Sequence, residues 1–339
     1  MKIAVGLSGG VDSSVAAYLL KEQGHGVTGV YMQCWNSKAD GCKADEDRAD
    51  AVKVAAYLGI PFDHLHFEKE YKEKVIDYFY KEHAAGRTPN PDVMCNKEIK
   101  FGMFFEWALR NGFDRVATGH YARAVAGRLL KGVDAGKDQS YFLYVLTSEQ
   151  LEKLIFPLGE MKKIAVRKIA REAGLHTAGK PDSVGICFIG EVDNRDFLRK
   201  RIKEHKGNVV NKIGEVLGEH DGVEFYTIGQ RHGFRVVRYH GLPLYVIGKN
   251  VEKNELIVGF GKDGLRESFE VGDLHWIDCA PKLPVRCDVR IRHLGELYPA
   301  TLSENLQVTL ASEMFGVAPG QSAVFYDGDM VLGGAVIAR

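Results

Sequence analysis

The hydrophobic positions in the first part of the chain follow two different periods in turn. Short apolar runs suited to buried strands occur at residues 2–7, 25–32, 62–67 and 114–118. Apolar side chains at helical spacing occur at residues 13–23, 46–58 and 101–111. Strands that alternate with helices of this length are typical of a doubly wound parallel sheet. We therefore predict an α/β domain over residues 1–204.

After about residue 204 the helical period disappears and short alternating runs follow one another, separated by glycines and turn residues. We predict strands at residues 215–217, 224–228, 244–247, 255–258, 285–291, 307–310, 322–326 and 330–338. This second part is too long for one small β module. We expect a central β-rich domain over residues 205–270 and a C-terminal β-barrel-like domain over residues 271–339.

The composition of the chain argues against several classes of protein. The chain has 339 residues, of which 45% are hydrophobic, and its 45 Lys and Arg balance 45 Asp and Glu. This balance argues against a disordered chain and against a uniformly basic coat for nucleic acid. No apolar run reaches the ~18–20 residues of a membrane span, and six cysteines are too sparse for a disulfide scaffold. We expect a cytoplasmic protein without membrane association.

A glycine-containing segment, SGGVDSS at residues 8–14, lies between the first predicted strand and the first predicted helix. Glycines allow a tight turn with outward-pointing N–H groups, and a helix N-terminus favours phosphate oxygens. The Gly-Lys-Ser/Thr ending of kinase and GTPase loops is absent, and the glycine spacing differs from the dinucleotide fingerprint. We predict a phosphate-binding loop made of Gly6, Leu7, Ser8, Gly9, Gly10, Val11, Asp12 and Ser13; a purely structural turn is the alternative.

The loop resembles the SGGxDS pyrophosphate loop of the ATP pyrophosphatase superfamily, and further segments resemble the tRNA-specific 2-thiouridylases within it. They are NPDVMCNKEIKF at 90–101, ATGHY at 117–121, KDQSYF at 137–142, GICFI at 185–189, FYTIGQR at 225–231 and PGQSAVFYDG at 319–328. The resemblance implies ATP-dependent 2-thiolation of the wobble uridine (U34) of tRNA. In such a reaction the base O2 is adenylated and a cysteine persulfide supplies sulfur, giving 2-thiouridine, AMP and pyrophosphate.

Exchange of oxygen for sulfur at a uridine C2 requires a better leaving group and a strong sulfur nucleophile, and a persulfide meets the second need. The resemblance implies that Cys95 is the nucleophile, Cys187 the persulfide carrier and Asp92 an acid/base partner. An inert buried thiol is the alternative for each cysteine. A zinc site of Cys34, Cys42, His64 and His66 is disfavoured because no Cys-x-x-Cys pair occurs. We expect Cys279 and Cys287 to be structural.

The resemblance also implies contacts with ATP and tRNA. Met32 and Gly119, at the ends of predicted strands, would contact the adenosine, although a methionine there could simply be core. We expect Asp12 to position Mg²⁺ through water, without a tightly bound metal. The family's tRNA-contacting positions correspond to Lys137, Asp138, Gln139, His120 and Gln321, and its target-base segment to Asn90, Pro91 and Asp92. The pair Arg292-His293 departs from the family's Arg-Tyr, which weakens the correspondence there.

Phosphate contacts require local positive charge. Candidate basic segments contain Arg199, Lys200, Arg201, Lys203, Lys206, Arg231, Arg235, Arg238, Arg286, Arg290 and Arg292, although any one of them could be an ordinary solvated face. The expected partners are tRNA and a sulfur-donor protein that loads the persulfide.

Two other functions remain open from the sequence. One is a superfamily relative that adenylates a small metabolite and transfers nitrogen to it, which would need neither Cys95 nor Cys187. The other is a non-catalytic RNA-binding protein whose α/β domain senses ATP.

Overall fold

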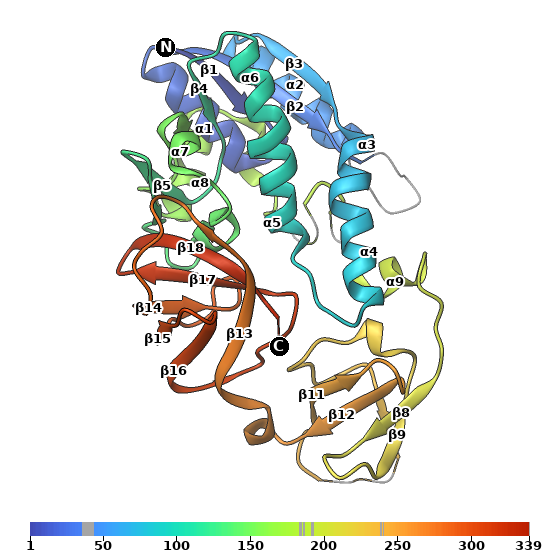
Figure 1. Ribbon diagram of the computed structural model, residues 1–339. Helices are drawn as coiled ribbons and strands as arrows, with labels where there is room; N and C mark the ends of the chain where they lie inside the picture. Colours follow the sequence, from blue (N-terminus) through green and yellow to red (C-terminus); the bar gives the residue numbers. More distant parts are fainter. Residues whose placement is uncertain are drawn as a thin grey trace.

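The computed structural model describes residues 1–35, 44–182, 185, 187–190, 193–237, 239 and 241–338. Figure 1 shows an α/β domain at the top and two β-rich domains below it. Among the described residues, no helix is both long and apolar enough to cross a membrane.

The first domain is built on a five-stranded parallel sheet with strand order β3-β2-β1-β4-β7. Its strands are β1 (Lys2–Gly6), β2 (Gly26–Gln33), β3 (Phe62–His66), β4 (Arg115–Ala117) and β7 (Leu154–Ile155). Its α-helices are α1 (Val11–Glu22), α2 (Ala44–Leu58), α3 (Glu68–Tyr71), α4 (Asp77–Ala84), α5 (Pro91–Cys95), α6 (Phe105–Arg110), α7 (Ser148–Glu152), α8 (Lys163–Glu172) and α9 (Asn194–Arg199). The predicted α/β fold class is confirmed.

Helices cover both faces of this sheet because successive side chains of a strand point to opposite sides. Ile3 and Val5 of β1 pack with apolar residues of α1, α2 and α8. Ala4 faces the other side, where the core is formed with α3–α6 and two π-helical segments, η2 (Lys72–Ile76) and η3 (Asn96–Phe104). Three 3₁₀ segments of the chain, η4 (Ser140–Leu143), η5 (His176–Gly179) and η6 (Val223–Phe225), are single short turns.

The central domain is a five-stranded sheet with strand order β10-β9-β8-β12-β11. Its strands are β8 (Gly207–Val210), β9 (Val216–His220), β10 (Arg235–Val236), β11 (Tyr245–Asn250) and β12 (Glu255–Gly259), followed by the 3₁₀ turn η7 (Gly261–Gly264). The predicted strand at 224–228 was wrong: this buried apolar run begins with η6 and continues as a turn in which the Thr227 N–H donates to the Gln230 side chain. A short buried apolar run does not distinguish a strand from a compact turn.

The C-terminal domain is a closed antiparallel barrel of six strands, because β13 pairs with both β16 and β18. Its strands are β13 (Leu265–Trp276), β14 (Val285–Arg290), β15 (Tyr298–Leu302), β16 (Gln307–Phe315), β17 (Ser322–Asp327) and β18 (Met330–Ile337). Pairing of β13 starts at Leu265, so the boundary that we predict at residue 271 falls inside this strand. A hairpin of the first domain, β5 (Ala122–Val125) and β6 (Arg128–Lys131), extends the barrel sheet through β18.

Candidate active site

The predicted phosphate-binding loop joins β1 to α1 and is held together by its own side chains. Helix α1 begins at Val11, two residues earlier than we predict, with Gly10 as its N-cap. Ser13 Oγ accepts from the Ser8 N–H at 3.1 Å, and Ser14 Oγ donates to the Gly10 carbonyl at 2.7 Å. Gly9 has φ +75°, and a Cβ there would overlap the Asp47 carbonyl. The loop is therefore preformed in front of the positive end of a 12-residue helix.

Lysines bind the loop from two sides. The buried Lys163, at the start of α8, donates to both carboxylate oxygens of Asp12 at 2.7 Å. Lys180 donates to the Gly9 carbonyl at 3.0 Å and to Asp47 at 2.7 Å and Asp50 at 2.8 Å. Sequence reasoning missed both lysines, because each lies about 150 or more residues from the loop and only the fold brings it there.

Asp182 connects the loop to the segment that leads to Cys187. Its carboxylate lies 2.9 Å from Lys163, 2.6 Å from Lys137 and 2.5 Å from Arg167. Burial would raise the pKa of Asp182, but the hydrogen bonds from Lys137 and Lys163 outweigh it and hold the pKa well below its usual range. Residues 137, 163, 167 and 182 thus form one charged cluster beside the phosphate loop.

The two predicted adenosine contacts meet the loop at the carboxyl ends of the parallel strands. The Met32 methyl group lies 3.2 Å from where a Cβ on Gly6 would be. A Cβ on Gly119 would lie 2.8 Å from the backbone nitrogen of Ser13, so only glycine allows this approach to the start of α1. The structure therefore brings Gly6, Met32 and Gly119 to the end of the sheet where open α/β proteins bind ligands.

Among the described residues around the loop, the Asp12 carboxylate already accepts hydrogen bonds from protein groups. Both oxygens of Asp12 accept from Lys163, and one also accepts from the Tyr121 hydroxyl at 2.7 Å. Among the described residues, no cluster of three or more His, Cys, Asp or Glu side chains is arranged to hold a metal ion. A magnesium ion at this loop would therefore have to arrive with the nucleotide phosphates, which is its common mode of binding.

A second group of predicted residues surrounds Cys95. Asn90 caps helix α5 by accepting from the N–H groups of Asp92 at 3.1 Å and Val93 at 3.3 Å, and Pro91 occupies the first helical turn. Cys95 ends α5 and is fully buried. The sequence Asn-Pro-Asp thus starts a short helix that places Asp92 and Cys95 one turn apart.

Cys187 lies against Cys95 although the two are 92 positions apart. The two unbonded thiols share a hydrogen bond. The backbone of Cys187 is fixed on both sides: its N–H donates to Asp92 Oδ1 at 3.1 Å, and its carbonyl accepts from the Tyr71 hydroxyl at 2.5 Å. The next residue, Phe188, adopts a left-handed conformation with φ +66°. Strained backbone of this kind persists only where the surroundings enforce it, and it is common at functional sites.

The two thiols differ in acidity. The hydrogen bond from Cys95 lowers the pKa of Cys187 to about 7; burial opposes this shift, and the Lys100 ammonium supports it. Burial raises the pKa of Cys95 well above its usual value, and the charge of Cys187 raises it further. Burial also raises the pKa of Asp92, against the hydrogen bond from the Cys187 N–H. Of the two thiols, Cys187 is therefore the one that begins to ionise near neutral pH, while Cys95 stays protonated.

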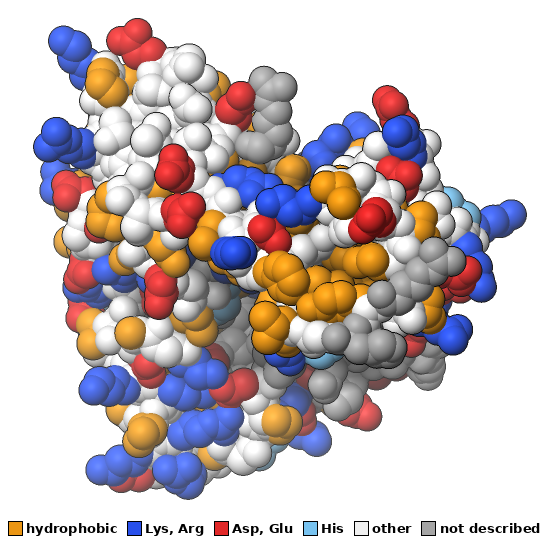
Figure 2. All heavy atoms as spheres, turned by 90° about the horizontal axis from the view of Figure 1, so that it is seen from below, with side chains coloured by type: hydrophobic (Ala, Val, Ile, Leu, Met, Phe, Trp, Pro, Cys, Tyr) orange, Lys and Arg blue, Asp and Glu red, His pale blue; other side chains and the backbone are white. Residues whose placement is uncertain are grey.

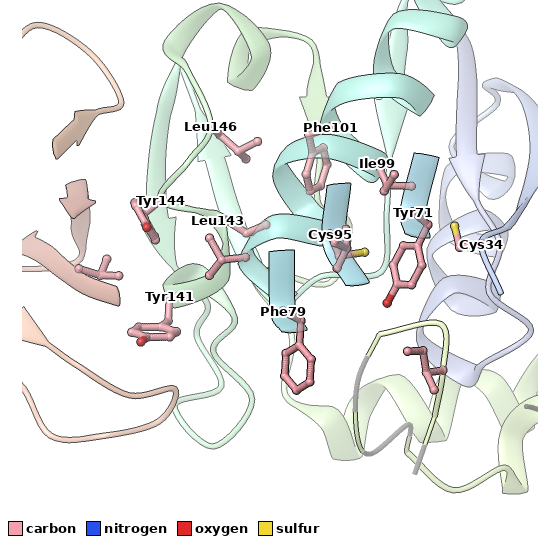
Figure 3. Close-up of a cluster of buried hydrophobic side chains, with 14 of the residues drawn as sticks. Cys34, Tyr71, Phe79, Cys95, Ile99, Phe101, Tyr141, Leu143, Tyr144 and Leu146 are labelled. Atoms are coloured by element: carbon pink, nitrogen blue, oxygen red, sulfur yellow. The ribbon is translucent and has the colours of Figure 1, made fainter. Parts of the chain in front are cut away.

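Tyr71 and Cys34 also lie close to Cys95 and Cys187. In Figure 3 the Cys95 sulfur points toward Tyr71, with Cys34 beyond it. Burial raises the pKa of the Cys34 thiol well above its usual value, and the nearby Cys187 adds to this effect. The predicted position of Cys34 in a zinc site remains disfavoured: Cys34 belongs to this buried core, and Cys42 lies outside the described residues. The His64 and His66 rings lie against one another in a tilted arrangement, with ring centroids 4.3 Å apart.

The remaining cysteines lie in the C-terminal part of the chain. Cys279 is exposed, and Cys287 is half-buried on β14, where burial raises its pKa to about 12. The surroundings of Cys287 therefore do not activate its thiol.

Three family models match the chain in succession. Residues 1–191 match the tRNA methyl transferase HUP domain, residues 195–260 the tRNA methyl transferase PRC-barrel domain, and residues 266–337 the aminomethyltransferase beta-barrel domain. A protein named tRNA-specific 2-thiouridylase MnmA from Geobacillus thermodenitrificans is 47% identical, covering 99% of this chain and 94% of that protein. The chain belongs to the tRNA-specific 2-thiouridylase family.

A second relative in this family, from Exiguobacterium sibiricum, is also 47% identical, with 99% of this chain and 93% of that protein covered. Among solved structures, the U34-tRNA thiolase NcsA from Methanococcus maripaludis is 21% identical with a TM-score of 0.37, covering 56% of this chain and 63% of that chain. The match with the two relatives extends over all three domains, so the resemblance stated from the motifs is confirmed.

Several positions that correspond to tRNA contacts of the 2-thiouridylase family are occupied by internal contacts here. Asp138 is buried and accepts from Arg290 of the barrel at 2.9 Å. Gln139 accepts from the Tyr121 N–H at 3.0 Å, and Gln321 donates to the Thr88 carbonyl at 2.9 Å. His120 is buried and hydrogen-bonds to Thr118 at 2.7 Å. Their roles toward tRNA remain predictions; in the structure they fix the shape of the surface.

The Arg292-His293 pair lies where all three domains approach one another. Arg292 donates to the Ile228 carbonyl of the central domain at 3.3 Å and to the Gly316 carbonyl of the barrel at 3.1 Å. The His293 ring packs on Phe142 of the first domain with centroids 4.4 Å apart. His293 thus takes part in aromatic packing between the barrel and the first domain.

The predicted basic segments do not form a uniformly positive face. Arg199 pairs with Asp196 and Glu204, Arg201 with Asp77, and Lys206 with Glu219. On the face shown in Figure 2, lysines and arginines are scattered among acidic side chains, and hydrophobic side chains gather over the central domain. Arg231, Arg235 and Arg292 are exposed, whereas Arg238 lies outside the described residues.

Proposed function

We propose that this protein catalyses ATP-dependent 2-thiolation of uridine 34 in tRNA. The observation that carries the proposal is the pair of adjacent thiols, fully buried Cys95 and half-buried Cys187, with opposite pKa shifts, Cys95 raised and Cys187 lowered. A protein that only senses ATP, or a relative that transfers nitrogen, has no use for such a pair. The family membership and the preformed phosphate loop support the same reaction.

The first step of the proposed reaction is adenylation. The uridine O2 attacks the α-phosphorus of ATP, pyrophosphate leaves, and AMP becomes bonded to O2. The loop at residues 8–13 would bind the pyrophosphate portion through its N–H groups and the start of α1. The target base would be turned out of the anticodon loop toward residues 90–92, which a single-stranded loop permits at low cost.

The second step transfers sulfur. A persulfide on Cys187 attacks C2 with its terminal sulfur, and AMP leaves with the original oxygen. The Cys95 thiolate then attacks the Cys187 sulfur, which forms a Cys95–Cys187 disulfide and releases the base as 2-thiouridine. The transferred sulfur gains two electrons and the two thiols lose them, so a dithiol reductant is required before the next turnover. Asp92, within the same cluster, is the proposed acceptor of the Cys95 proton.

The pKa difference assigns these two roles. Loading requires a thiolate that attacks the sulfane sulfur of a donor persulfide, and Cys187 is the thiol of the pair that ionises near neutral pH. Cys95 must stay protonated until the transfer has occurred, which its raised pKa favours. The donor is proposed to be a protein that carries a cysteine persulfide.

The test is incubation with unmodified tRNA, ATP, Mg²⁺ and a persulfide donor, followed by mass analysis of the nucleosides and peptide mapping without reductant. We expect 2-thiouridine at position 34, one AMP and one pyrophosphate per product, and a Cys95–Cys187 disulfide after a single turnover. Unmodified uridine 34 under these conditions, with ATP bound, would refute the proposal.

A further inference from the structure

A half-buried lysine, Lys100, lies beside the two thiols and takes no part in the steps derived above. The Lys100 ammonium group lies beside the Cys187 side chain, close enough for its charge to act on that thiol. It also lies over the Phe188 ring, 5.7 Å from the ring centroid. The cation therefore contacts the sulfur-bearing residue and its strained neighbour at the same time.

The local helix geometry places this lysine. Lys100 follows Cys95 by five residues, and in an α-helix such a pair would be turned apart by about 140°. Residues 96–104 instead form the π-helix η3, whose hydrogen bonds join residues five positions apart. The wider turn brings Lys100 to the side of the helix where Cys95 and Cys187 meet.

The other groups that face Cys187 are acidic. Cys95 and Asp92 come from α5, Tyr71 from α3, and Cys34 follows β2. Each of them is either neutral or negative, so Lys100 supplies the positive charge of this cluster. Burial lowers the pKa of Lys100, but the charges of Cys187, Cys95 and Asp92 outweigh burial, so the ammonium remains protonated. A cation in a poorly hydrated cluster acts strongly on an adjacent anion.

Phe188 helps to hold Lys100 and Cys187 in place. Its ring lies between the Lys100 ammonium and the Tyr71 ring, whose centroid is 5.9 Å away in an edge-to-face arrangement. The left-handed backbone of Phe188 directs this ring into the cluster directly after Cys187. The Cys187 sulfur and the lysine are therefore positioned by packing as well as by charge.

We propose that Lys100 is a catalytic residue that stabilises the anionic sulfur of Cys187, first as the thiolate and then as the persulfide; the persulfide part rests on the proposed function. In loading, the Cys187 thiolate attacks the sulfane sulfur of the donor persulfide, the new S–S bond forms, and the donor leaves as a thiolate. The ammonium also stabilises the terminal sulfur anion of the persulfide until that sulfur attacks C2.

The test replaces Lys100 by Met, which keeps the length and removes the charge, and by Arg, which keeps the charge. The rate of Cys187 alkylation by iodoacetamide is measured from pH 5.5 to 10 by peptide mass spectrometry. Wild type and Lys100→Arg should reach half-maximal rate near pH 7. Lys100→Met should shift this midpoint upward by about one pH unit or more, and its alkylation at pH 7 should be about fivefold slower or more.

Lys97→Met is the matched control, because Lys97 is exposed on the same π-helix. It should keep the wild-type midpoint, and all variants should keep the circular dichroism and ATP affinity of wild type. Loading with glutathione persulfide at pH 7 should slow in Lys100→Met alone.

A wild-type alkylation profile in a folded Lys100→Met protein overturns the proposal, even if the wild-type enzyme thiolates tRNA. Conversely, a shifted midpoint with no thiolation by wild type would refute the proposed function and leave the effect of Lys100 on the Cys187 thiolate standing.

Discussion

The phosphate loop and the thiol cluster are two reactive regions of one domain that are built in different ways. The loop is a continuous stretch at residues 6–13, and its main hydrogen bonds join residues three to five positions apart. The thiol cluster combines Cys34, Tyr71, Asp92 to Lys100, and Cys187, which come from four separate segments. Only tertiary packing brings those segments together.

The loop therefore depends on local structure, whereas the thiol cluster depends on the tertiary fold. The loop can bind phosphate as soon as β1 and α1 form, because its N–H groups and helix end are local. The acidity of Cys187 depends on Cys95 and Lys100 reaching it across the fold. We therefore expect substitutions in the loop to abolish one ligand contact cleanly, whereas substitutions around the thiols should alter the reactivity of their neighbours.

The largest expected effect is at Cys187. Cys187→Ser should bind ATP and tRNA normally and yield no detectable 2-thiouridine, because an alkoxide cannot carry sulfur. Cys95→Ser should also lose turnover, yet Cys187 should still be loadable with persulfide. Nucleoside mass analysis and peptide mapping measure both. Cys279→Ser, at an exposed thiol, is the control and should be fully active; thiolation by Cys187→Ser would remove the assigned roles.

The next effect concerns the loop. Gly10 has an extended backbone with φ −93° and ψ 166°, and a Cβ there meets only the Ser8 hydroxyl at 3.5 Å. Gly10→Val should therefore fold, while its side chain fills the space in front of α1 and weakens ATP binding about 100-fold or more. Calorimetric titration and circular dichroism test this.

Gly272→Ala, at a barrel position with open space around it, is the matched control for Gly10→Val. Its ATP affinity should equal that of wild type. Normal ATP affinity in Gly10→Val would show that phosphates do not occupy the front of α1.

An intermediate effect is expected where the two regions are connected. Asp182→Asn removes the charge that Lys137, Lys163 and Arg167 share, and should lower the free energy of unfolding by about 1–3 kcal/mol at pH 7. Because the folded-state pKa of Asp182 lies below its unfolded value, this stabilisation is complete above about pH 4 and is lost as the pH falls further. Urea unfolding at pH 7 and pH 3 tests this.

Glu172→Gln is the control for Asp182→Asn, since Glu172 pairs only with the exposed Lys168 on α8 at 3.7 Å among the ion pairs of the described residues. It should change stability by at most a few tenths of a kcal/mol. If Asp182→Asn and wild type have the same free energy of unfolding at pH 7, the charged cluster around Asp182 does not stabilise the link between the loop and the segment before Cys187.

The smallest effect concerns the tRNA surface. If Arg292 contacts one phosphate, Arg292→Ala should reduce the logarithmic salt slope of tRNA binding by about 0.7–0.9. Binding measured between 50 and 200 mM salt gives this slope. An unchanged slope would leave Arg292 with only its contacts to the Ile228 and Gly316 carbonyls.

The same contrast explains what the sequence could predict. The strands and the helix around the predicted phosphate-binding loop follow from local patterns, so β1, β2, β3 and α1 lie within a few residues of their predicted positions. Lys100 lies in a recognised motif, but an α-helical spacing would direct it away from Cys95; the π-helical turn has no signal in composition. Lys163, Lys180 and Asp182 carried no signal at all, because their partners are distant in the chain.

Buried apolar runs were ambiguous for a different reason. Residues 224–228 have the composition of a strand but form a turn beneath the central sheet. The helices at Glu68–Tyr71 and Asp77–Ala84 were not predicted, because charged and aromatic residues interrupt their apolar period. When a segment is buried from several sides, its apolar residues follow no single period. The hydrophobic pattern then does not predict its secondary structure.

The pairing of β6 with β18 has a consequence for biosynthesis. Leu130 is paired across the sheet with Met330, which the ribosome adds 200 residues later. At about 5–20 residues per second, the edge of β6 stays open for about 10–40 s. An unpaired strand edge is a template for association with other chains. The first domain therefore emerges from the ribosome with an unpaired edge on β6, which β18 covers later. Shortened chains that lack residues 330–337 should aggregate through this edge.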